Sequence, residues 1–146
     1  MRFKFPFQKI MDLKSNEKSQ AEWMLSSALV QLNEEEQLLH QLQVEKDQIQ
    51  DHWREYSAVS MPAADLQMMH QYIHHLDSQI ERKQRDIEKA QSDVSDKQQN
   101  LSSRMLDEKV WSKAKEKALI QYQRLVQKQE QEQLDELATV RFTFKT

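Results

Sequence analysis

The chain has 146 residues, of which 31% are charged, and it contains no glycine, no cysteine and only two prolines. A mean hydropathy of −0.92 excludes a thick globular core, and the lack of cysteine excludes disulfides and thiolate metal sites. The formal net charge of −3 provides no strong basic field for nucleic acid or for an anionic membrane. No apolar run approaches the ~18 residues of a membrane span, and the first residues are too few and too charged for a signal peptide. We therefore expect a cytoplasmic protein.

The first expected element is a helix over about residues 8–57, which begins just after Pro6, a residue tolerated at helix starts. Apolar residues recur there in two interleaved rows with a spacing of seven, which keeps one stripe facing a partner helix. The rows are Met11, Leu25, Leu32, Leu39 and Trp53, and Ala21, Ala28, Leu42, Ile49 and Tyr56, with interruptions at Lys14, Lys18, Glu35 and Lys46.

The strongest break in this pattern lies between Ser57 and Asp65, and it predicts a turn at 58–61. Ser60 is a candidate N-cap. Pro62 suits the first turn of a following helix because it has no N–H to donate.

A second helix is expected over about residues 62–138. One row is unbroken in its first half: Leu66, Ile73, Ile80, Ile87, Val94 and Leu101. The other row consists of Met69, Leu76, Ala90, Trp111, Ala118 and Leu125, and it is interrupted by Lys83, Lys97 and Arg104. Long basic side chains can lay their methylene groups along such a seam. After Leu101 the first row continues only through Glu108 and Lys115.

These patterns predict an all-α protein with two long helices in an antiparallel coiled-coil hairpin, forming a single domain over 1–146. The helices would be roughly 75 and 115 Å long. The second helix would extend beyond the first from about Trp111. Periodicity alone leaves open a self-dimer, including a long parallel dimer with a kink at Pro62.

Residues that could carry chemistry are few. His70 and His74 are four residues apart and could chelate a metal, but no HExxH pattern accompanies them. Without glycine there is no phosphate-binding loop, and a two-helix rod offers no concave pocket. We therefore expect no catalytic, cofactor-binding or metal-binding residues, and no enzyme activity.

Three stretches of the chain resemble the FliJ family of the bacterial flagellar export apparatus. The spaced Phe3, Phe5 and Phe7 before the first helix are similar to the family's opening. The stretch 72–80, Tyr-Ile-His-His-Leu-Asp-Ser-Gln-Ile, resembles its central signature, and the Asp-Glu pair within 134–142 resembles its closing motif.

The resemblance implies a non-enzymatic stalk at the inner face of the cell membrane that inserts into the ring of the export ATPase, FliI, and activates it. It also implies contact with the export gate protein FlhA, and export chaperones are further expected partners. Neither nucleic acid binding nor direct membrane insertion is expected. By position, the ATPase contacts would be Phe3, Phe5, Phe7, Ile10, Asp135 and Glu136. The gate contacts would be Trp53, Tyr56, Met69, Tyr72 and Leu76.

Two other functions fit the same pattern. One is a coiled-coil scaffold or holdase-like chaperone with no link to a motor. The other is the equivalent stalk protein of a virulence-type secretion system.

Overall fold

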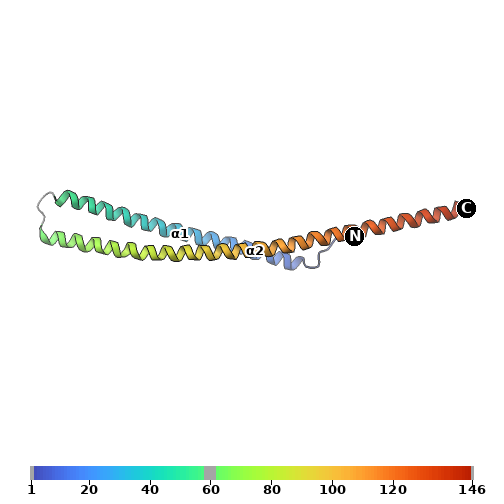
Figure 1. Ribbon diagram of the computed structural model, residues 1–146, viewed down its shortest axis with the longest axis horizontal. Coiled ribbons are helices and arrows are strands. Elements are labelled where there is room, and N and C mark those ends of the chain that lie inside the picture. Colours follow the sequence, from blue (N-terminus) through green and yellow to red (C-terminus); the bar gives the residue numbers. More distant parts are fainter. Residues whose placement is uncertain (1, 58–61, 146) are drawn as a thin grey trace. The chain divides into compact units, whose positions relative to one another are not determined.

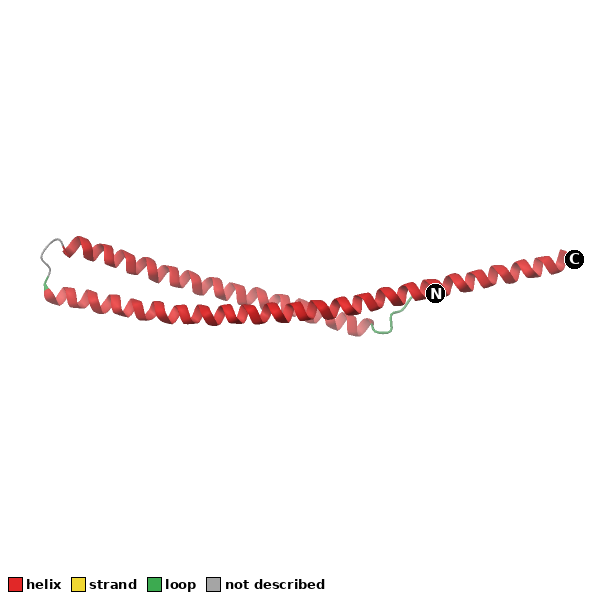
Figure 2. Ribbon diagram, viewed as in Figure 1, coloured by secondary structure: helices red, strands yellow, loops and turns green. Residues whose placement is uncertain are grey.

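The computed structural model describes residues 2–57 and 62–145, and this part of the chain forms two helices (Figures 1 and 2). α1 spans Gln8–Ser57 and α2 spans Ala63–Lys145. No strand occurs among the described residues, so the predicted all-α class is confirmed. The expected turn at 58–61, with its candidate cap Ser60, lies outside the residues that the structure describes.

Carbonyl groups just before each helix accept hydrogen bonds from its first amides. The amide of Gln8 donates to the carbonyl of Phe5 at 3.2 Å, and the amides of Asp65 and Leu66 donate to the carbonyl of Pro62 at 3.1 and 3.3 Å. These bonds satisfy amides that have no partner within the helix. Asp65 also places a negative charge at the positive end of the helix dipole.

α2 continues to Lys145, beyond the end near residue 138 that the sequence predicts. Val140, Phe142 and Phe144 alternate with polar residues, which is a strand-like pattern, yet all three belong to the helix. A strand needs a neighbouring strand for its backbone hydrogen bonds, whereas a helix satisfies its own. Since no strand lies beside it within residues 2–57 and 62–145, this segment is better accommodated by prolonging the helix.

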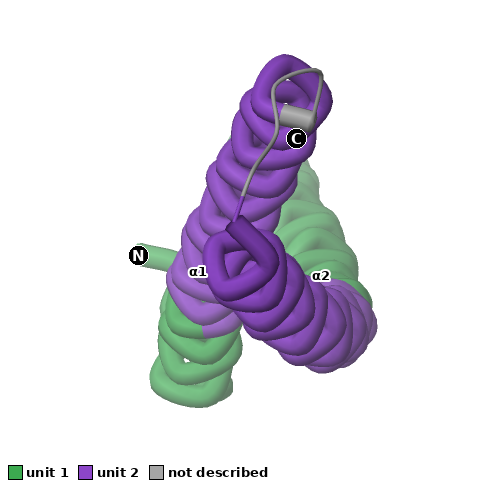
Figure 3. The backbone as a smooth tube through the Cα atoms, turned by 90° about the vertical axis from the view of Figure 1, so that its left-hand side faces the viewer, with its two compact units in different colours: residues 1–20, 102–146 green, residues 21–101 purple. Residues whose placement is uncertain are grey.

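The chain divides into two compact units (Figure 3), and the expected single domain over 1–146 stays a prediction. Unit 1 comprises residues 1–20 and 102–146, and unit 2 comprises residues 21–101. Each unit contains part of both helices.

In unit 2 the two helices lie side by side and run antiparallel (Figure 1). Contacts between them pair later residues of α1 with earlier residues of α2, such as Glu35 with Lys83 and Trp53 with His70. Every seam position predicted in unit 2 is buried or half-buried except Tyr56, which is 47% exposed. The fully buried core of the described residues lies in this unit and is formed by Ala21, Ala28, Leu76 and Val94.

In unit 1 the first turns of α1 pair in the same antiparallel sense with α2. Lys18 lies 3.1 Å from Glu108, and Arg104 lies 3.0 Å from Glu17. None of the described residues of unit 1 belongs to the fully buried core, so charged and aromatic contacts hold this pair together.

The α2 seam extends further than its apolar pattern suggests. Glu108 and Lys115 are half-buried, followed by Tyr122 and Val126. Leu125, which the predicted row includes, is instead 61% exposed. Beyond the α1 helix no coiled-coil partner imposes a 3.5-residue repeat, so the buried face follows the natural 3.6-residue period of a helix.

Candidate interaction surfaces

An aromatic cluster fixes the segment before α1 onto α2 in unit 1. The rings of Phe3 and Tyr122 are 5.3 Å apart between centroids, and those of Phe7 and Trp111 are 5.7 Å apart. Phe5 lies edge-on to Phe7 at 5.8 Å. Such tilted and edge-on arrangements are favourable for aromatic pairs. The three phenylalanines predicted to contact the ATPase are thus brought together, with Phe3 and Phe5 half-buried and Phe7 48% exposed.

The other predicted ATPase contacts are exposed but do not join this cluster. Ile10 is 38% exposed on α1. Asp135 and Glu136 are exposed on α2, about 20 Å along the helix from Tyr122. The carbonyl of Asp135 accepts a hydrogen bond of 2.8 Å from the hydroxyl of Thr139.

An ionic cluster lies next to the aromatic one, and the sequence reasoning did not identify it. Glu17 Oε2 lies 3.0 Å from Arg104 and 3.5 Å from Lys14. Lys18 donates to Glu108 Oε1 at 3.1 Å, while the buried Oε2 of Glu108 has no hydrogen-bond partner among the described residues. Opposite charges at seam positions of both helices were the signal that could have revealed this cluster.

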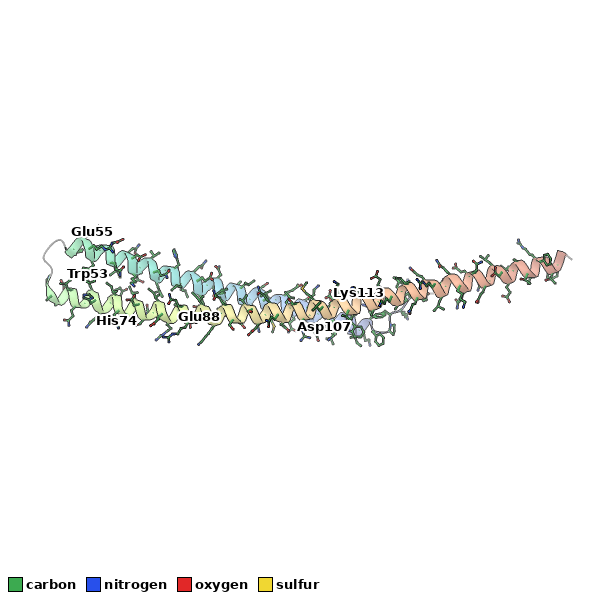
Figure 4. The ribbon with its side chains drawn as sticks, in the orientation of Figure 1. Trp53, Glu55, His74, Glu88, Asp107 and Lys113 are labelled. Carbon is green, nitrogen blue, oxygen red and sulfur yellow. The ribbon has the colours of Figure 1, made fainter. Side chains whose placement is uncertain are left out.

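In unit 2, where α1 ends and α2 begins, the gate contacts predicted from sequence surround a small aromatic contact. Trp53 points from α1 toward α2 (Figure 4), and its ring meets that of His70 edge-on at 4.5 Å. Met69 is half-buried beside this contact. Tyr56 is exposed and packs edge-on against His52 at 4.4 Å.

Tyr72 and Leu76 differ sharply in what they can contact. Tyr72 is 44% exposed, and its hydroxyl donates to Glu45, a hydrogen bond that raises the pKa of Tyr72. Leu76 is only 2% exposed and belongs to the core, so it cannot offer a surface to a partner. Met68, which is not among the predicted gate contacts, is 68% exposed on the same part of α2.

The histidines of this region lie near the link between the two helices. The ring of His70 is engaged with Trp53, and no group of three or more possible metal ligands occurs among the described residues. Within the described ranges, neither helix has a stretch apolar enough to cross a membrane.

The last part of α2 exposes apolar side chains to solvent. All residues from 127 to 144 are exposed. The large apolar ones are Leu134, Leu137, Val140, Phe142 and Phe144.

Comparisons with known proteins agree with this architecture. A putative YscO homolog from Chlamydia trachomatis, CT670, has a similar structure, with a TM-score of 0.68 over 95% of this chain and 94% of that chain. The two sequences are 17% identical, so the likeness concerns the fold. No curated protein matches the chain. The family model described as "Flagellar FliJ protein" matches residues 3–145, and the chain therefore belongs to the FliJ family.

Proposed function

We propose that this protein is the coiled-coil stalk of a flagellar type III protein export apparatus, without catalytic activity of its own. In this role it binds and activates the ring of the export ATPase FliI and links that ring to the export gate FlhA, at the cytoplasmic face of the membrane. The observation that carries the proposal is membership of the FliJ family over residues 3–145.

The ATPase contact is assigned to unit 1. Its aromatic cluster presents Phe7 to solvent next to Ile10, and α2 then continues with an exposed apolar surface toward Phe144. Exposed aromatic and aliphatic side chains are typical of the buried centre of protein interfaces. The exposed carboxylates of Asp135 and Glu136 add polar contacts on the same helix.

Activation follows from a mismatch of symmetry. A ring of identical subunits that surrounds a two-helix stalk contacts the stalk unequally, because the stalk presents a different face to each subunit. Unequal contacts stabilise different nucleotide states in different subunits, which is a coupling between the stalk and the ATP sites. Coupling of this kind requires a continuous stiff element, and α2 is unbroken over 83 residues.

The gate contact is assigned to the end of unit 2 near the link between the helices. Tyr56, Met68 and Tyr72 are exposed there, while Trp53 and Met69 support them from the seam. Methionine and tyrosine bury a large area for little loss of side-chain entropy, which suits a protein contact. Export chaperones are further partners for this surface.

The proposal is tested by the rate of ATP hydrolysis of purified FliI from the same organism. Adding this protein should raise the rate, and Phe5→Ala should weaken the increase because it removes an aromatic anchor of unit 1. Trp23→Ala is the matched control, since Trp23 is 72% exposed and lies in unit 2. An unchanged rate with the wild-type protein would count against the proposal.

The likeness to the YscO homolog favours a second candidate, the stalk of a virulence-type secretion system. Stimulation of a virulence-type ATPase but not of FliI would support it. The exposed apolar residues near Phe144 also suit a holdase-like chaperone, which would bind unfolded clients whether or not a nucleotide is present.

A further inference from the structure

The charged residues are unevenly distributed between the two units. Acidic residues outnumber basic ones in unit 2, and the reverse holds in unit 1. The nearly balanced charge of the whole chain conceals this difference. The strongest concentration lies on α2 between residues 109 and 128, where Glu116 is the single acidic residue and the basic ones are Lys109, Lys113, Lys115, Lys117, Arg124 and Lys128.

Five of these side chains form a line along one face of α2. We name them the basic stripe: Lys109, Lys113, Lys117, Arg124 and Lys128. Their spacings of four, four, seven and four residues keep them on one side of a helix. All five are exposed, and none makes an ion pair within residues 2–57 and 62–145. Figure 4 labels Lys113, the second residue of the basic stripe along α2.

The basic stripe does not overlap the seam that holds the N-terminal segment. The seam of this region runs through Trp111, Lys115 and Tyr122, which are half-buried. At 3.6 residues per turn, the basic stripe lies on roughly the opposite side of α2. It therefore stays accessible while the aromatic cluster is in place.

Apolar side chains lie among the basic ones on this face. Leu106 and Val110 are 64% and 65% exposed, and Ile120 is 42% exposed. Aliphatic side chains beside the basic ones can add apolar contact to the electrostatic attraction between lysine and anionic lipid. Beyond Lys128 the chain turns acidic through Glu130, Glu132, Asp135 and Glu136, which sets the end of the positive surface.

We propose that the basic stripe is a docking surface for an anionic phospholipid bilayer, to which α2 adsorbs without crossing it. Charge complementarity supports binding to a bilayer. The stripe is straight over roughly 30 Å, so all five cations can reach one flat layer of phosphates together. Four of the five are lysines, which act as point charges and lack the planar fork by which arginine recognises carboxylates or nucleic acid. No aromatic side chain on this face could stack on a nucleobase.

The test is co-sedimentation of the full chain with vesicles. Vesicles containing phosphatidylglycerol should bind the protein, vesicles of phosphatidylcholine alone should not, and added salt should weaken the binding. The triple variant Lys109→Gln, Lys113→Gln and Lys117→Gln should bind roughly 100-fold more weakly, because each lysine contributes about a fivefold step.

The matched control removes three exposed basic residues from unit 2, as Arg82→Gln, Arg85→Gln and Lys89→Gln, and should bind like the wild type. Circular dichroism of both variants checks that the helices are retained. Equal losses in both variants, or no binding by the wild type, would overturn the proposal. If the protein binds poly-L-glutamate but not vesicles, the stripe is a site for an acidic protein instead. If the protein self-associates in a salt-sensitive way and the triple variant does not, the stripe is a site for a second copy of the chain.

The proposal does not depend on the export function, but the basic stripe lies on the part of α2 that the ATPase ring would surround, so one molecule would bind the bilayer or the ring and not both at once. Binding to anionic vesicles without stimulation of FliI would support the membrane surface and contradict the proposed function.

Discussion

The ammonium group of Lys83 on α2 donates a hydrogen bond of 2.9 Å to Glu35 on α1, and both residues occupy seam positions of unit 2. Asp86 lies 3.6 Å from the same ammonium group. A shift of one helix along the other would separate these charges and place them against apolar neighbours. Polar pairs in a coiled-coil seam fix the register in this way. The pair therefore aligns α1 with α2 in unit 2.

Replacing Lys83 with methionine should lower the free energy of unfolding. Lys83→Met leaves Glu35 in the seam without its partner, and an unpaired, partly buried carboxylate is costly. The double variant Lys83→Met with Glu35→Leu should recover the loss, because two apolar residues pack without needing a hydrogen bond. Urea unfolding followed by circular dichroism measures both. A double variant less stable than the single one would show that the charge pair itself stabilises the seam.

Alkaline pH should destabilise unit 2. The hydrogen bond to Glu35 raises the pKa of Lys83 above 10.5, and the hydrogen bond to Glu45 raises the pKa of Tyr72 above 10.0. In each case the folded state holds the proton more tightly than the unfolded state. This contribution to stability is present in full below pH 10.0 and is lost as the pH rises through the folded-state values. Urea midpoints measured across this range should fall, and they should fall less in Tyr72→Phe.

Leu76→Ala should be strongly destabilising. Leu76 is 2% exposed, and shortening a leucine in such a site costs about 2–5 kcal/mol. Met68→Ala is the control, because Met68 is 68% exposed and its loss should change stability by no more than about 0.5 kcal/mol. Because Leu76 is buried, Leu76→Ala should weaken binding to FlhA only to the extent that it reduces helix content. Weaker binding by a fully folded Leu76→Ala protein would restore Leu76 as a direct contact.

High salt should loosen the start of α1 more than the rest of it. In unit 1 the helices are joined by the cluster of Glu17, Lys18, Arg104 and Glu108, whose side chains are 27–38% exposed. At about 1 M salt, screening acts over roughly 3 Å, which weakens such partly exposed pairs. Hydrogen exchange should accelerate over residues 8–20 and stay nearly constant over 21–57. Uniform changes along α1 would contradict this division.

The apolar repeat was enough to predict the two helices and the seam of unit 2, because residues such as Leu32 and Ile80 recur without ambiguity. It was least informative after Leu101, where Glu108 and Lys115 occupy seam positions and Leu125, which the predicted row includes, is 61% exposed. Leu76 was assigned to a contact surface although it is core, because a heptad position does not show how completely its partners cover it. The repeat did not show which exposed residues share an accessible helix face. The basic stripe could be recognised only once the structure had located the seam on the other side of α2.

If the export ATPase holds unit 1, hydrogen exchange of this protein should differ with and without assembled FliI. We predict slower exchange over residues 8–20 and 111–144 in the presence of FliI, with no change over residues 63–80. Unchanged exchange throughout, or protection confined to the region around Tyr72, would contradict the account.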